Sequence, residues 1–171
     1  PFAGMLFSDL GAEVTVIHRK EKSDFSNHKN ILDRGKRSIE LNLKDPDDLV
    51  VAKKLIIRSD AVIEGFRPGV MEKLGLGPNE FSENPSLVYG RMTGWGQDGP
   101  KSKQAGHDLN YIGLSGALWF ASQPNTPPFT PPALVGDVGG GALYLVIGVL
   151  SAILNARESG RGSVVDAAIV D

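Results

Sequence analysis

Apolar and polar positions along the chain fall into short blocks that switch repeatedly between helical and extended spacing. Apolar residues within 2–10 recur at helical spacing, and Gly11 follows them as a residue typical of helix ends. Residues 14–17 are few and β-branched, which predicts a buried strand. Residues 38–43 alternate strictly between polar and apolar side chains, so they predict a second strand with one polar face.

The alternation of helices and strands continues through the middle of the chain. Asp45 and Pro46 form a helix cap and a first helical position, and the predicted helix runs to about Ser59. Short strands are expected at 61–63 and 86–92, with short helical stretches at 67–75 and 78–83. The segments expected after them are a glycine-rich loop at 94–106, a partly helical stretch at 107–121 and an extended, proline-rich segment at 122–132.

The most apolar run covers residues 139–156, where Ser151 and Asn155 are the polar breaks. It is shorter than the ~20 apolar residues that a membrane span needs, so we predict a buried core helix and no membrane span. Strands that alternate with helices are typical of an α/β fold with a Rossmann-like parallel sheet and flanking helices. Ligands of such sheets bind beyond the carboxyl ends of the strands. The segments expected near a site therefore follow Ile17, Leu43, Ile63 and Met92.

Composition narrows the class of protein. The 171 residues carry 18 basic and 20 acidic side chains, and a net charge of −2 gives no general affinity for nucleic acid. The chain has no cysteine, which excludes disulfides and thiolate chemistry. Both ends fall inside apolar patterns, and the first residue is Pro1 rather than Met. We therefore expect residues 1–171 to be part of one large domain, truncated at both termini, of a longer enzyme.

Positive charge is concentrated between residues 18 and 37, where seven Lys or Arg side chains face three acids, a local charge of +4. Two interpretations remain open for this segment. It is a solvated loop, or it is a phosphate site at the end of a strand, where arginine forks suit phosphate oxygens. The chain has neither a GxxxxGK[ST] nor a GxGxxG motif after a strand, so side-chain cations would have to hold any nucleotide.

Polar residues stand out at two otherwise apolar places. His107 and Asp108 lie in the run GHDLNY at 106–111, and Asp137 lies directly before the most apolar run. Structural explanations exist for both: a hydrogen-bonded histidine at a loop-to-helix joint, and a helix N-cap. The three histidines are too widely spaced for a metal site, and no GxSxG motif indicates a serine hydrolase. Acid–base chemistry by a histidine and a carboxylate is the remaining interpretation.

Several motifs occur in a fixed order along the chain. They are PFAGMLFSDLGAEVTVIHR at 1–19, RGKRS at 34–38, FRPGVM at 66–71, TGWGQ at 93–97, GHDLNY at 106–111 and SGRG at 159–162. Together they resemble the family III CoA-transferase superfamily, and most closely its α-methylacyl-CoA racemase branch. The resemblance implies a CoA-binding, catalytic domain from an interlocked homodimer. It also implies an acyl-CoA substrate from lipid metabolism, no cofactor besides that CoA, and a cytoplasmic location.

The resemblance also implies roles for particular residues. The catalytic histidine falls on His107, and its partner acid falls on Asp137. The residues expected to bind CoA or the thioester are Arg19, Leu41, Asn42, Leu43, Lys44, Gly106, Asn110 and Tyr111. The chain departs from the family pattern twice, with Asn42 in place of an acid and Ala133 in place of an asparagine.

A racemase needs two bases on opposite faces of the α-carbon, one of which begins protonated. Burial raises the pKa of Asp137 and a helix N-terminus lowers it, and the balance stays open at this point. Backbone N–H groups near Asp108 or the glycines at 139–141 are candidate donors to the enolate oxygen. A rival reaction is CoA transfer, in which Asp108 attacks the thioester to form an acyl anhydride. We favour the racemase because His107 supplies its base; a CoA-binding module without activity is a third possibility.

Overall fold

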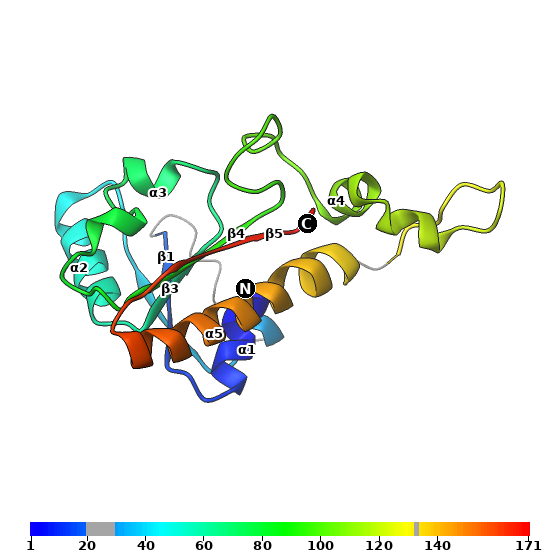
Figure 1. Cartoon of the computed structure of the whole chain (residues 1–171). Helices are drawn as coiled ribbons and strands as arrows, with labels where there is room; N and C mark the ends of the chain where they lie inside the picture. Colours follow the sequence, from blue (N-terminus) through cyan, green and yellow to red (C-terminus); the bar gives the residue numbers. More distant parts are fainter. Residues whose placement is uncertain (20–29, 132–133) are drawn as a thin grey trace.

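The computed structural model of the chain describes residues 1–19, 30–131 and 134–171 (Figure 1). Its strands are parallel, as predicted, but in the described residues they form two sheets rather than one. Strands β1 (Val14–His18) and β2 (Lys36–Glu40) make a two-stranded sheet. Strands β3 (Ala61–Glu64), β4 (Val88–Thr93) and β5 (Val164–Ala168) make a three-stranded sheet with β4 in the centre. The predicted α/β class is confirmed.

Helices cover both faces of the three-stranded sheet. On one face, α1 (Phe2–Asp9) and α5 (Leu143–Ser159) share an apolar cluster with Val88 of β4. On the other face, α2 (Pro46–Ile57) and α3 (Val70–Lys73) share a second cluster with Tyr89. Successive residues of a strand point to opposite faces, so the neighbours Val88 and Tyr89 anchor opposite layers. This two-sided packing confirms the predicted flanking helices (Figure 1).

The second strand was predicted at 38–43. In the structure, β2 begins at Lys36 and ends at Glu40. Side-chain hydrogen bonds explain the early end. The N–H of Asn42 donates to the carboxylate of Asp48 at 2.8 Å, and Asn42 Oδ1 accepts from the N–H of Lys44 at 3.2 Å. These amides are therefore taken out of the ladder, and the chain turns toward α2.

Several shorter elements complete the chain. The stretches predicted at 78–83 and 107–121 appear as the 3₁₀ turn η4 (Pro78–Glu80), the helix α4 (Asp108–Ser115) and the 3₁₀ turn η5 (Ala117–Ala121). A further 3₁₀ turn, η3 (Ile31–Asp33), was not predicted. Residues 122–131 contain no regular element. Figure 1 shows α4, η5 and this proline-rich segment extending away from the sheets.

The long apolar run forms a π-helix, η6 (Val135–Ala142), which continues directly into α5. Leu145 and Val149 of α5 are buried, whereas Tyr144 and Leu154 are each 67% exposed. The prediction of a buried core helix is therefore correct for one face only. Within the described residues, the continuous helix Val135–Ser159 meets the length and composition expected of a membrane span. Of its most apolar 18-residue stretch, 33% is buried in the structure. Those two criteria do not distinguish a spanning helix from a core helix.

The cap of α2 provides a direct test of this fold. Asp45 Oδ1 accepts from the N–H groups of Asp47 and Asp48, at 3.0 and 3.2 Å. Asp45→Ala leaves both donors without this acceptor, so we expect the free energy of unfolding to fall by about 1 kcal/mol. Asp45→Asn keeps a capping oxygen and is the matched control. Denaturant unfolding measures both, and equal losses would contradict the capping role.

Candidate active site

A cavity of about 480 Å³ opens at the carboxyl ends of β3 and β4, where the parallel-sheet rule places ligands. Loop residues 65–68 form one wall, and residues 92–95 form its base. The loop at 102–107, Tyr111 of α4 and Asp137 of η6 complete it. Four of the predicted site residues therefore meet here: Gly106, His107, Tyr111 and Asp137.

His107 stands at the joint between the glycine-rich loop and α4. Its backbone is extended, with φ −139° and ψ 171°, and it is the N-cap residue of the helix. Its N–H donates to Asn110 Oδ1 at 2.9 Å, and the N–H of Asn110 donates back to the carbonyl oxygen of His107 at 2.8 Å. Asn110 therefore fixes the backbone that carries the imidazole.

Asp108 follows as the first residue of α4, and it is 4% exposed. Its Oδ2 accepts two hydrogen bonds, from the N–H of Gly136 at 2.8 Å and from the N–H of Asp137 at 2.7 Å. The carboxylate thus ties the start of η6 to the start of α4. It places His107 and Asp137 on the same cavity, although 30 positions separate them along the chain.

The fit at this contact explains why residue 136 is glycine. A Cβ on Gly136 would lie 2.7 Å from Asp108 Oδ2 and 3.0 Å from the side chain of Ile112. Any larger residue would push η6 away from Asp108. The close approach is therefore possible only because this position has no side chain.

Two aromatic rings of the cavity lining pack against Gly106, the residue before His107. Trp95 and Tyr111 meet edge to face, with ring centroids 4.7 Å apart and an interplanar angle of 78°. Gly94 makes room for this pair, since a Cβ there would lie within 2.2 Å of the Tyr111 ring. Tyr111 is buried, and the loop that leads into His107 packs against its ring at Gly106.

The pKa of Asp137 is raised above its ordinary value. Burial is the largest cause and the negative charge of Asp108 the second, while His107 acts in the opposite direction. The pKa of Tyr111 is also raised, mainly by burial and then by Asp137. Burial is therefore the main influence on the pKa of Asp137.

The interpretation of Asp137 as a helix N-cap is wrong, because η6 begins after Leu134 and has no side-chain cap.

Five of the residues predicted to bind CoA, Arg19 and residues 41–44, lie at another edge of the fold. Arg19 and Leu41 follow the ends of the paired strands β1 and β2, and the N–H of Leu41 donates to the carbonyl of His18 at 2.8 Å. The cavity at β3 and β4 includes neither Arg19 nor Leu41, Asn42, Leu43 or Lys44. The structure thus brings these residues together at one sheet edge, apart from His107 and Asp137.

Ion pairs account for part of the basic segment. Arg34 pairs with Asp9, Lys36 with Asp33 at 3.4 Å, and Arg37 with Glu13 at 3.5 Å. The cations at positions 20, 22 and 29 lie outside the described residues, as does Ala133. Of the cations in this segment that the structure describes, Arg19 is the one that directly follows the end of β1. Among the described residues, Arg19 is therefore placed where the phosphate-site interpretation expects a cation.

Sequence reasoning missed Arg67 as a site residue. Of the described residues that line the cavity, Arg67 alone carries a permanent positive charge. The motif FRPG, which begins two residues after β3 ends, could have pointed to Arg67 in the sequence.

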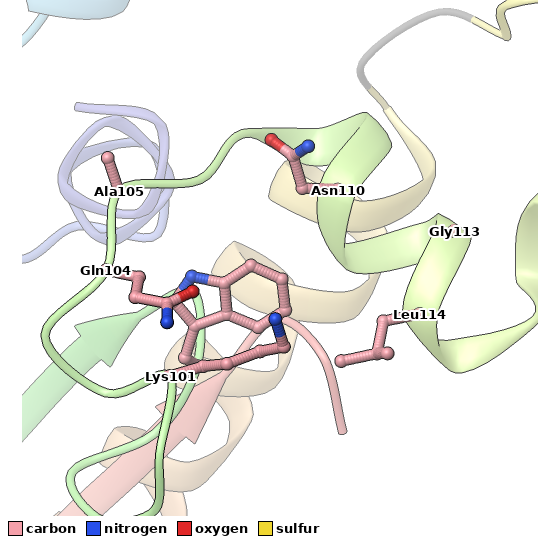
Figure 2. A pocket seen from close by; sticks show the side chains of 7 residues that line it. Lys101, Gln104, Ala105, Asn110, Gly113 and Leu114 are labelled. Atoms are coloured by element: carbon pink, nitrogen blue, oxygen red, sulfur yellow. The ribbon is translucent and has the colours of Figure 1, made fainter.

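The predicted site residue Asn110 lines a smaller neighbouring hollow of about 380 Å³ rather than this cavity. Figure 2 shows Lys101 and Gln104 on the loop side of that hollow, with Asn110 and Leu114 on the α4 side.

The part of the chain that the structure describes contains no group of three or more metal-binding side chains. A histidine and a carboxylate, His107 and Asp137, line one cavity at the carboxyl edge of a parallel sheet. A family model described as CoA-transferase family III matches residues 1–171, and the chain belongs to this family.

Named relatives include enzymes of two kinds. The chain is 43% identical over 172 residues to the alpha-methylacyl-CoA racemase of Mus musculus and 42% identical over 173 residues to that of Homo sapiens. Each match covers 100% of this chain and 44% of the relative. The succinate–glutarate CoA-transferase of Agrobacterium fabrum is 30% identical over 190 residues, with 100% and 47% covered.

The fold agrees with solved structures of the family. A CAIB/BAIF family protein from Brucella suis superposes with a TM-score of 0.89 at 28% identity, over 100% of this chain and 49% of that one. The chain spans about half the length of the relatives it matches. Both racemases and CoA-transferases occur among these relatives.

The raised pKa of Asp137 yields a prediction about stability. A carboxyl whose pKa is higher in the folded than in the unfolded chain favours folding when protonated, and this contribution is lost as pH rises through the folded pKa. Asn does not titrate. Asp137→Asn in the full-length protein should therefore raise the Tm at neutral pH, with a gain that disappears below about pH 4, the ordinary range of Asp. A gain independent of pH in thermal scans would contradict this account.

Proposed function

We propose that the full-length protein is a racemase that interconverts the (R) and (S) forms of 2-methylacyl-CoA thioesters by two-base proton exchange. The observation that carries the proposal is the meeting of His107 and Asp137 in one cavity, with the pKa of Asp137 raised. The similarity to two alpha-methylacyl-CoA racemases over the whole chain supports the substrate class. The CoA is part of the substrate, and no further cofactor enters the reaction.

The proposed reaction moves one proton off the α-carbon and returns another to the opposite face. One base, neutral His107 or ionised Asp137, takes the α-proton, and the C–H electron pair becomes the enolate of the thioester. The other group, protonated at the start, delivers a proton to the opposite face. A raised pKa at Asp137 favours the protonated form that this second role needs. The two groups exchange roles when the other enantiomer reacts.

The enolate oxygen needs hydrogen-bond donors during this step. The N–H of Gly139 donates to the carbonyl of Leu134 at 2.8 Å, and the N–H groups of Gly136 and Asp137 donate to Asp108. The amides of Asp108 and Leu109 open α4, and the first amides of a helix have no acceptor within it. We therefore propose that these two amides, next to His107, provide the donors.

CoA would extend from the cavity toward the edge formed by Arg19 and residues 41–44. Arg19→Ala should weaken CoA binding about tenfold, on the scale of one charge-assisted contact of ~1–3 kcal/mol. If Arg19 holds the 3′-phosphate, the loss should be much smaller for dephospho-CoA. Calorimetric titration of the full-length protein with both ligands measures this, and equal losses would remove Arg19 from that role.

CoA transfer is the second candidate, because relatives such as the Agrobacterium fabrum enzyme carry that name. Asp108 is the nucleophile that the family resemblance suggests for it. Its burial, and its two hydrogen bonds to backbone N–H groups, favour an orienting role instead. Asp137 is the carboxylate that lines the cavity, so a transferase built on this site would form its acyl anhydride more readily there.

Three variants of the full-length protein distinguish these reactions. His107→Ala and Asp137→Asn should each abolish net racemisation, yet each should retain slow solvent exchange of one enantiomer through the remaining base. Asp108→Asn keeps one oxygen near the two amides and should reduce the rate less than either. Enantiomer-specific deuterium uptake at the α-carbon measures all three.

The opposite pattern identifies a transferase. Mass spectrometry would then detect an acyl or CoA adduct on an aspartate of the wild-type protein, and His107→Ala would retain full turnover. A protein that binds CoA but neither exchanges deuterium nor forms an adduct would be a binding module.

A further inference from the structure

A buried ion cluster lies directly behind the 65–68 wall of the cavity. Arg91 of β4 and Glu64, the last residue of β3, are paired across the two strands. Arg91 Nε donates to Glu64 Oε1 at 3.1 Å, and its Nη2 donates to Glu72 of α3. The side chains of Glu64 and Arg91 are 5% and 10% exposed, whereas that of Glu72 is 45% exposed. Glu64 is thus the inner partner and Glu72 the outer one.

The two oxygens of Glu64 have different partners. Oε1 accepts from Arg91, while Oε2 accepts from the backbone N–H of Phe66 at 2.7 Å. Phe66 belongs to the cavity wall, and the next residue is Arg67, the cation of that wall. One carboxylate therefore connects the sheet to the backbone that carries Arg67.

Arg91 also lies over an aromatic ring of the core. Its guanidinium lies 5.4 Å from the centre of the Tyr89 ring, and the Tyr89 hydroxyl donates to the carbonyl of Leu76 at 2.7 Å. Tyr89 and Leu76 are both buried in the core next to α2 and α3. The position of Glu64 is therefore fixed by the core rather than by the loop.

We propose that Glu64 is a positioning residue that holds the 65–68 wall so that Arg67 meets the bound acyl-CoA. The proposal rests on the proposed function in one respect: it requires that the cavity binds a CoA thioester. A role in stability alone explains the arrangement less well, since a buried ion pair seldom stabilises a fold more than apolar residues of the same size. Burial raises the pKa of Glu64, so the fold holds the charged form of this side chain at a cost.

The chemistry of the side chain suggests the test. A carboxylate has two acceptor oxygens, whereas the amide of glutamine has one. Glu64→Gln can therefore satisfy Arg91 or Phe66, but not both. Glu72→Gln is the matched control, because Glu72 also accepts from Arg91 but does so from α3 rather than from the strand that leads into the wall. Both variants weaken the ion cluster, but only Glu64→Gln also removes an acceptor that Arg91 and the N–H of Phe66 would then have to share.

The experiment uses the full-length protein, with CoA as the probe in calorimetric titration and thermal melts of each variant. Glu64→Gln should raise the Kd for CoA about tenfold, the scale of one charge-assisted hydrogen bond, while Glu72→Gln should change it less than twofold at a similar loss of Tm. In an Arg67→Ala background, Glu64→Gln should produce no further loss of CoA affinity. Such non-additivity is expected only if Glu64 acts through Arg67.

The proposal is overturned if Glu64→Gln and Glu72→Gln weaken CoA binding equally, or if the effects of Glu64→Gln and Arg67→Ala add. Glu64→Asp retains the charge beside Arg91 but is one methylene too short to reach both partners, so it replaces Glu64→Gln should that variant fail to fold. CoA affinity does not depend on which reaction the enzyme performs. A failed racemase assay with intact Glu64–Arg67 coupling would therefore reject the proposed function and leave this inference standing.

Discussion

Two hydrogen bonds to one carboxylate oxygen hold the candidate active site together. Oδ2 of Asp108 accepts from the backbone of Gly136 and Asp137, so the first turn of α4 and the first turn of η6 cannot separate. His107 precedes this carboxylate, and Asp137 is one of its donors. The placement of both proposed bases therefore depends on a contact between segments that lie far apart in the sequence, and on a glycine that permits it.

The same contact influences protonation. Burial, and then the negative charge of Asp108, raise the pKa of Asp137. A carboxyl next to another carboxylate ionises less easily, so its protonated form is favoured. A proton donor must be in this protonated form. Position and protonation are thus coupled, and burial is the largest cause of the raised pKa.

Local signals were predictable from the sequence and long-range contacts were not. The cap at Asp45 and the order of strands and helices follow from neighbouring residues, and the structure confirms them. The early end of β2 depends on the side chain of Asp48, six positions away from Asn42. An all-apolar helix gives no indication of which face is buried, so the exposed side of α5 was not predicted. The grouping of Gly106, His107, Tyr111 and Asp137 followed from family resemblance rather than from periodicity.

The central claim is that His107 and Asp137 exchange the α-proton of an acyl-CoA without forming a covalent intermediate. The most direct test is to incubate the full-length wild-type protein with one enantiomer of a 2-methylacyl-CoA in D₂O, with no acceptor carboxylic acid present. The account predicts that the substrate racemises and that every inverted molecule carries deuterium at the α-carbon. Retention of configuration without deuterium, with turnover only after a carboxylic acid is added, would contradict it.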